Sequence, residues 1–343
     1  MEDEVASGRA LRKRLLDPLL AGRKGKETTL FICPADLVHA LPLEALPLDE
    51  GGVVGDRFRV VNEVTMRRFL APEDPPPDGG TPEILAIGGV NFSAAAETPA
   101  EPRSVMSVPN DGPAPEGGLA RDFPELPGSL GEVLEIRTLF ANAFDHSPPL
   151  LVGSAATKAA FHDLAPGKRY LHLATHGRFE EVDFPEPPAQ GALWSPLDPN
   201  EAVRSYAPMS LCGLAFAGAS HGRDGLSRVP GILTAEELAG IDLSACELAV
   251  LSACETSVGL RSAGLGILSL QSALHTAGVR TAVTSLWKVD DEATGRLMVR
   301  FYTYLWEEKL SKAEALWKAK CDLREEGRPK RHWAAWVISG SPR

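Results

Sequence analysis

The stretch ELAVLSACETSVG, Glu247 to Gly259, is an unbroken apolar run that changes abruptly to small polar residues. A second stretch, RYLHLATHG from Arg169 to Gly177, has the same form. Short runs without polar interruption are typical of strands that are buried on both faces of a parallel sheet. Both stretches therefore predict buried parallel strands that end in polar residues.

The rest of the chain alternates between short apolar runs and helical periodicity. Strands are predicted at residues 29–33, 84–92, 150–152, 209–219 and 278–287, and helices at residues 5–20, 130–141, 154–164, 263–277, 290–310 and from 311 onward. Helix starts are marked by Ser154, by Asp290 or Asp291, and by Ser311 with Glu314. Strands that alternate with helices predict an α/β protein with a mostly parallel sheet and helices on both faces.

The composition is that of an ordinary globular protein. Of 343 residues, 44% are apolar and 24% are charged, which excludes disorder throughout the chain. Lys and Arg number 35 against 46 Asp and Glu, so the formal net charge is −11, and such a surface repels the phosphate backbone of nucleic acids. The sequence has no signal-peptide pattern, no run of ~18 apolar residues, and five cysteines without CxxC spacing or His clustering. We expect a cytoplasmic protein without disulfides or bound metal, and without direct contact to nucleic acid or membrane.

His176 and Cys254 follow the two apolar runs. Ligands of an open parallel sheet bind beyond the carboxyl ends of its strands, so these two residues lie where chemistry is expected. A cysteine nucleophile needs an acid or base within reach and N–H donors for a developing oxyanion, which the amides of Gly177 and Cys254 can supply. The alternative is that both residues are structural, because a lone cysteine in a strand is more often a small core residue. We assign that structural role to His172, and to the remaining cysteines Cys33, Cys212, Cys246 and Cys321.

GLGILS, Gly264 to Ser269, faintly resembles a dinucleotide-binding fingerprint. The first glycine of such a motif directly follows a strand, whereas Gly264 comes ten residues after Cys254 (264 − 254 = 10). The string therefore does not predict a nucleotide site.

HLATHG, residues 172–177, and LAVLSACET, residues 248–256, resemble the motif pair of the CHAT domain, a caspase-like cysteine peptidase family. The resemblance extends from about residue 11 to about residue 340 and includes residues 31–47, 150–161, 231–243, 284–294 and 332–340. It implies that His176 is the general acid/base, that Cys254 is the nucleophile, and that the amides of Gly177 and Cys254 hold the oxyanion. It implies neither a metal nor a cofactor.

The resemblance also implies a caspase-like α/β/α sandwich. A degenerate N-terminal half, residues 1–145, would be joined to an active C-terminal half, residues 146–343. Two stretches rich in proline and glycine, residues 93–128 and 180–208, lie outside the resemblance. Because they offer little apolar surface to bury, we expect exposed loops that proteases cut first.

Asp291 follows the predicted strand that ends in SLWKV. Related caspase-like peptidases such as separase carry an acidic residue there that reads a basic side chain, so the resemblance implies a pocket for Arg or Lys. The alternative is helix capping, since an acidic residue at a helix start is favoured by the free N–H groups and the helix dipole.

The sequence and the resemblance together predict a cysteine endopeptidase that acts on a protein substrate and is regulated, for example by a helical-repeat partner. Bacterial members of the family act in defence and programmed cell death, and a gasdermin-like pore former is one substrate that the resemblance suggests. The alternative is a catalytically silent CHAT-fold module that binds partners.

Overall fold

The computed structural model describes residues 2–21, 28–34, 36–64, 81–94, 123–179, 208–221, 231–252 and 270–343. Cys254 lies outside these ranges, and so do residues 95–122 and 180–207, which make up most of the two predicted loops. The predictions for the undescribed part of those loops stay predictions. At the end of the first predicted loop the prediction is wrong, because Phe123 is buried and Pro127 and Gly128 begin a helix.

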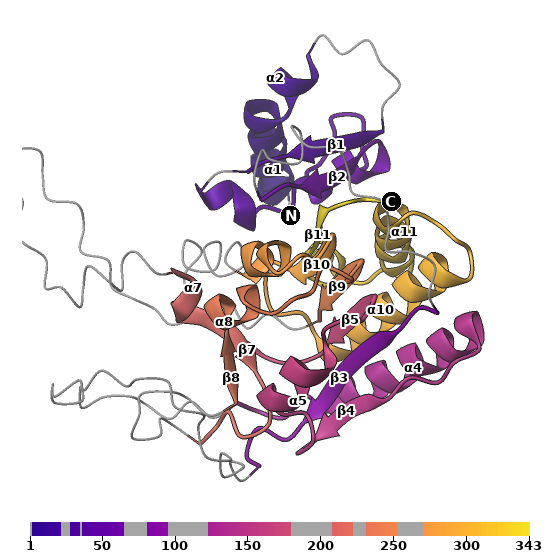
Figure 1. The fold of residues 1–343 in the computed structure, drawn as a ribbon. Coiled ribbons are helices and arrows are strands. Elements are labelled where there is room, and N and C mark those ends of the chain that lie inside the picture. The colour runs from indigo at the N-terminus through magenta and orange to yellow at the C-terminus, as the bar shows by residue number, and fades with distance from the viewer. Residues whose placement is uncertain are drawn as a thin grey trace, which may run out of the picture.

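A sheet of eight strands runs through the described part of the protein (Figure 1). In chain order its strands are β1 Thr29–Ile32, β2 Arg59–Asn62, β3 Ile84–Val90, β4 Leu150–Gly153, β5 Tyr170–Leu173, β9 Leu248–Leu251, β10 Thr281–Ser285 and β11 Trp336–Gly340. They lie side by side in the order β1-β2-β11-β10-β9-β5-β3-β4. Within the described ranges every neighbouring pair is parallel except β10 with β11. The predicted mostly parallel α/β sheet is confirmed.

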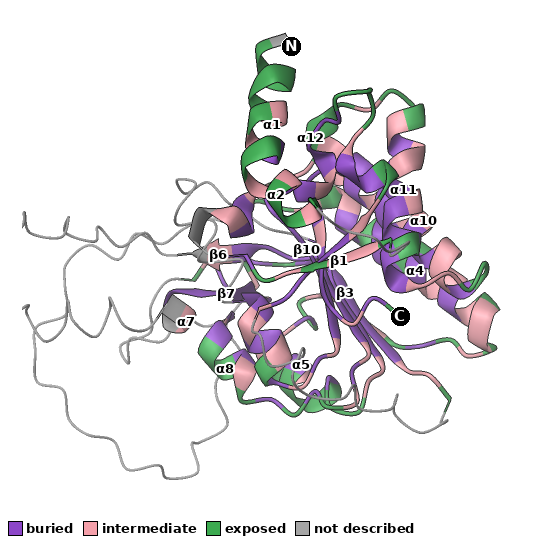
Figure 2. Cartoon of the chain, turned by 90° about the horizontal axis from the view of Figure 1, so that it is seen from above, coloured by how far each residue is buried: buried purple, intermediate pink, exposed green. Residues whose placement is uncertain are grey.

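Helices cover both faces of this sheet. One face is covered by α4 Pro127–Phe144, α10 Asp291–Trp306 and α11 Lys312–Glu325, and the other by α5 Lys158–Leu164, α8 Ala235–Ala239 and the helical residues 270–276. Successive strand residues point to opposite faces. Thus Tyr170 and Val250 pack with α4 and α10, while Leu171 and Leu251 pack with α5 and α8. Seen from above, buried strands lie between partly exposed helices (Figure 2).

Shorter elements complete the described fold. They are α1 Glu2–Leu15, α2 Asp17–Leu20, the 3₁₀ helices η1 Asp36–Ala40, η2 Leu43–Ala45 and η3 Val54–Asp56, α7 Pro208–Leu211 and α12 Lys330–Trp333. A second, antiparallel sheet has the order β6-β7-β8, with β6 Gly177–Phe179, β7 Cys212–Ala215 and β8 Ile232–Thr234. The strand predicted within residues 209–219 is therefore present as β7.

Several predicted helix boundaries are wrong. The helix predicted over residues 130–141 is longer, from Pro127 to Phe144, and the helix predicted to reach about residue 310 ends at Trp306. The helix expected over residues 5–20 is divided into α1 and α2, because Pro18 stands in the first turn of α2 and cannot occupy a helix interior. The helix expected after Ser154 starts later, at Lys158, and its cap is Thr157, whose side chain accepts from Ala160 N. Ser311 caps α11 as predicted.

The proposed division at residue 145 falls between α4 and β4. β3, which precedes that point, pairs with β4 on one side and with β5 on the other, so one continuous sheet extends across it. The organisation into two halves, one derived from the other, stays a prediction.

Candidate active site

The exits of β5 and β9 lie next to each other in register. These strands are parallel neighbours, and Leu173 is paired with Leu251 at their carboxyl ends. Ser252 N donates to Leu173 O at 3.0 Å, which extends the ladder by one residue. His176 is three residues beyond Leu173 (176 − 173 = 3), and Cys254 is three residues beyond Leu251 in the sequence (254 − 251 = 3).

The His176 ring is held in a fixed orientation. It is 2% exposed and packs in a cluster with two phenylalanine rings, with centroid distances of 5.0 Å to Phe92 and 5.6 Å to Phe123. Its Nε2 lies 2.7 Å from the carbonyl oxygen of Pro124. A carbonyl only accepts, so Nε2 carries a hydrogen, and in the neutral ring Nδ1 is then the nitrogen that can take up a proton.

The backbone around His176 is anchored to β7. Thr175 Oγ1 donates a hydrogen bond to Ala215 O, and Ala215 N donates to His176 O at 2.8 Å. The second bond makes the Gly177–Leu214 pair a non-hydrogen-bonded one, in which the N–H groups point away from the partner strand. The Gly177 amide thus points away from β7, the orientation that an oxyanion donor requires.

Asp291 is the first residue of α10, and it is not the residue that caps this helix. The cap is Asp290, whose carboxylate accepts from Ala293 N at 3.1 Å. Asp291 is half-buried, and its Oδ2 lies 3.4 Å from the amide of Gly128. Gly128 is four residues after Pro124 (128 − 124 = 4), so one short segment contacts both Asp291 and His176.

A buried polar network lies between the main sheet and the α4–α10 layer. Glu132 Oε1 accepts from His172 Nε2 at 2.9 Å and from Ser252 Oγ at 2.5 Å. His172 Nδ1 lies 3.2 Å from the hydroxyl of Tyr302. The structural role predicted for His172 is confirmed. Sequence reasoning missed Glu132, Tyr302 and Ser252, because no local motif marks them.

The cysteines outside the motif differ in accessibility. Cys33 is exposed, Cys321 is partly exposed, and Cys212 and Cys246 are buried. Burial raises the pKa of the Cys246 thiol to about 12. It also raises the pKa of Cys321. These environments suit core residues better than nucleophiles for Cys212 and Cys246, as predicted.

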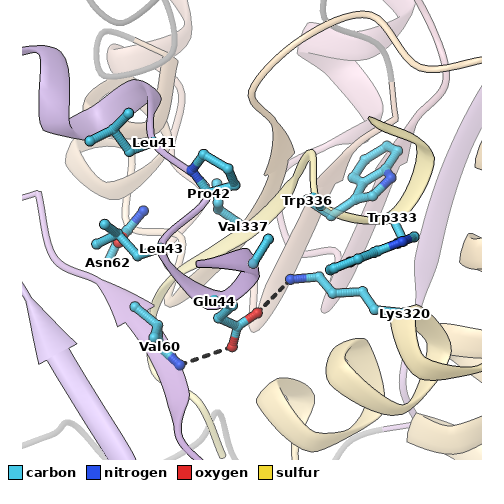
Figure 3. Close-up of a pocket in the computed structure, with 12 residues that line it drawn as sticks. Leu41, Pro42, Leu43, Glu44, Val60, Asn62, Lys320, Trp333, Trp336 and Val337 are labelled. Carbon is cyan, nitrogen blue, oxygen red and sulfur yellow. Dashed lines mark hydrogen bonds and ion pairs between the residues drawn. The ribbon is translucent and has the colours of Figure 1, made fainter. Parts of the chain in front are cut away.

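A pocket with a buried ion pair lies elsewhere in the protein, between η2, β2, α11, α12 and β11 (Figure 3). The carboxylate of Glu44 accepts from Val60 N at 2.9 Å and from Lys320 Nζ at 2.6 Å. The Lys320 side chain is only 2% exposed, so the pair is largely removed from water. The residues that line the pocket include neither His176 nor Asp291, and the pair joins the N-terminal segment to α11.

No group of three His, Cys, Asp or Glu side chains within the described ranges is arranged to hold a metal ion. Among the described helices, none combines the length and apolar character needed to cross a bilayer.

A comparison with protein-family models agrees with the motifs. The family model described as "CHAT domain" matches residues 5–341. A search of curated proteins found no match. One solved structure, described as "Structure of Protease", is similar with a TM-score of 0.43 at 10% sequence identity, over 94% of this chain and 61% of the other. The chain thus spans 61% of the length of that protein.

Proposed function

Because the chain belongs to the CHAT domain family, which matches residues 5–341, we propose that it is a cysteine endopeptidase with Cys254 as nucleophile and His176 as general acid and base. The family resembles caspases, and membership in it supports a peptidase fold for this chain. The choice of nucleophile and base rests on the positions of these two residues beyond neighbouring strands.

The register of β5 and β9 is the observation that carries the proposal. Adjacent strands are separated by about 4.8 Å. His176 and Cys254 each follow the paired residues Leu173 and Leu251 by three positions. In the sequence each residue comes just after the carboxyl end of one of two neighbouring parallel strands, the edge at which such a sheet binds ligands, and this supports a proton transfer between them.

In the proposed reaction, His176 Nδ1 takes the proton of the Cys254 thiol, and the thiolate attacks the carbonyl carbon of the scissile peptide. The electrons of the C=O bond move to oxygen, where the amides of Gly177 and Cys254 donate hydrogen bonds. When the C=O bond re-forms, the C–N bond breaks and the leaving nitrogen takes the proton from Nδ1. The products of this step are a free amine and a thioester on Cys254.

Water completes the cycle. His176 Nδ1 removes a proton from water as the oxygen attacks the thioester carbonyl. Collapse of the second tetrahedral species then breaks the C–S bond, the sulfur takes the proton from Nδ1, and the products are a carboxylic acid and the free Cys254 thiol. Throughout, the Pro124 carbonyl accepts from Nε2, which keeps the ring in one orientation and stabilises its positive charge while Nδ1 is protonated. Pro124 therefore serves here as the orienting third group.

We assign Asp291 to recognition of Arg or Lys on the amino side of the scissile bond. Two observations support this role: Asp290 supplies the helix cap, and Asp291 contacts the segment that also orients His176. A carboxylate in this position can pair with a guanidinium in a bidentate manner.

A protein substrate, a cytoplasmic location and control by a partner or by a regulatory segment belong to the same proposal. Cys33, Cys246 and Cys321 form no disulfide with another described residue, which fits a reducing compartment. The family resemblance makes pore-forming proteins of the gasdermin type and helical-repeat partners the first to assay, in the setting of bacterial defence.

The proposal is tested by incubating the purified chain with a bacterial proteome and identifying new N-termini by mass spectrometry. New termini that follow Arg or Lys and are absent after alkylation of the enzyme support it. A proteome without new termini, in the presence of every candidate partner assayed, contradicts it.

A further inference from the structure

Glu132 joins three elements of the fold through one carboxylate oxygen. It lies on α4 and is 5% exposed. Its Oε1 accepts from His172 on β5 at 2.9 Å and from Ser252, which directly follows β9, at 2.5 Å. Since an ionised carboxylate accepts short, strong hydrogen bonds, this oxygen ties α4 to both strands.

Tyr302 of α10 completes a set of matched donors and acceptors. The carboxylate of Glu132 requires the hydrogen on Nε2 of His172, which leaves Nδ1 of a neutral ring as the acceptor for the Tyr302 hydroxyl at 3.2 Å. Burial, and then the charge of Glu132, raise the pKa of Tyr302 well above its ordinary value, so the hydroxyl keeps its proton. Buried hydrogen bonds in which each donor meets an acceptor make the arrangement of their members rigid.

These hydrogen bonds lie close along the chain to the proposed nucleophile and base. Ser252 precedes Cys254 by two residues (254 − 252 = 2), and His172 precedes His176 by four (176 − 172 = 4). α4 follows directly on the segment whose Pro124 carbonyl accepts from His176. A displacement at Glu132 is therefore transmitted to both members of the pair and to the group that orients His176.

We propose that Glu132 is a positioning residue, which sets the separation between the Cys254 sulfur and the His176 ring by holding the exits of β9 and β5 against α4. This inference rests on the function proposed above. A structural role alone does not require this chemistry, because apolar side chains fill a buried site without the cost of removing a carboxylate from water.

Ser252→Ala is the decisive variant, because it removes one hydrogen bond to Glu132 and leaves a small side chain that the fold can accommodate. Glu132→Gln keeps an acceptor oxygen of nearly the same shape and serves as the conservative replacement. Glu135→Gln is the matched control, since Glu135 lies three residues further along α4 and is exposed (135 − 132 = 3). All three changes are made in the full chain.

Two readouts are compared. The first is the rate at which iodoacetamide alkylates Cys254 between pH 5 and 9, located by peptide mass spectrometry. The second is kcat and KM on a peptide taken from a cleavage site of the wild type. We expect Ser252→Ala to slow alkylation at pH 7 about tenfold, to move its pH midpoint upward, and to lower kcat about tenfold or more while KM changes less than about twofold. The alkylation rate and kcat of Glu132→Gln should lie between those of Ser252→Ala and the wild type. Those of Glu135→Gln should equal the wild-type values.

A structural role alone predicts another pattern, in which Ser252→Ala lowers the melting temperature while the alkylation profile and kcat stay equal to those of Glu135→Gln. That result overturns the inference. If the wild type cleaves no protein, the proposed function fails, whereas the alkylation profiles still decide whether Glu132 positions the thiol. If Glu132→Gln does not fold, Ser252→Ala decides alone.

Discussion

Leu173 of β5 and Leu251 of β9 are paired in register, and Ser252 N donates to Leu173 O at 3.0 Å just beyond them. The two strands consequently leave the sheet at the same level. His176 follows the first by three residues and Cys254 follows the second by three. A slip of one strand by one residue would turn its side chains to the opposite face of the sheet.

Alkylation with iodoacetamide at pH 7 is expected to modify Cys254 before any other cysteine, because a thiolate paired with a histidine is the reactive form. Burial protects Cys212 and Cys246, and the pKa of Cys246 is raised to about 12. Cys33 is exposed and is therefore the cysteine that competes most directly with Cys254 for the reagent. Time-resolved peptide mass spectrometry of the folded protein gives the order. Modification of Cys33 or Cys321 ahead of Cys254 is incompatible with an activated Cys254.

Asp291→Asn is expected to lower kcat/KM for substrates with Arg or Lys before the scissile bond about tenfold to hundredfold, which is about 1.4 to 2.8 kcal/mol. The physical reason is that the half-buried carboxylate of Asp291 would no longer form an ion pair with the Arg or Lys side chain of the substrate. Asp290→Asn is the matched control, because asparagine caps a helix about as well as aspartate. A peptide library read out by mass spectrometry compares the three enzymes. Equal profiles for both variants and the wild type would remove Asp291 from substrate recognition.

Glu247→Gln is expected to lower the free energy of unfolding by about 1 to 3 kcal/mol at pH 7. Burial alone would raise the pKa of Glu247, but Lys312 Nζ at 3.1 Å and Arg169 Nη2 at 2.6 Å outweigh it, and the pKa is lowered. A carboxyl whose pKa is lower in the folded state than in the unfolded state stabilises the fold at pH values above its unfolded-state pKa. This contribution is lost as the pH falls through the folded-state pKa.

The wild type should therefore have a larger free energy of unfolding than Glu247→Gln near pH 7. This difference in free energy should disappear as the pH falls below about 4. Denaturant unfolding at a series of pH values measures it. A difference that does not change between pH 7 and pH 3 is evidence that the charge of Glu247 is not what stabilises the fold.

Local sequence patterns predicted most strands of the main sheet, because burial on both faces leaves an unbroken apolar run such as Leu248 to Leu251. They missed β2 and the short strands β6 and β8. The start of α10 was also readable, although the sequence did not decide between Asp290 and Asp291 as its cap. The division between α1 and α2 was missed, even though Pro18 was visible in the sequence.

The partners of the site residues were not predictable in this way. Pro124 lies 52 residues from His176, and Glu132 lies 120 residues from Ser252. Such contacts depend on which strands become neighbours, and no local periodicity encodes strand order. An acidic residue in an amphipathic helix such as α4 is normally solvated, so Glu132 carries no signal of its own in a single sequence.

Cleavage of one verified protein substrate by the wild type, Cys254→Ala and His176→Ala, measured side by side under identical conditions, tests the central claim most directly. The account predicts cleavage by the wild type and no detectable cleavage by either variant. Both variants should still unfold cooperatively, with a lower melting temperature for His176→Ala because that change removes a buried ring. Wild-type turnover by either folded variant would contradict the proposed pair of nucleophile and base.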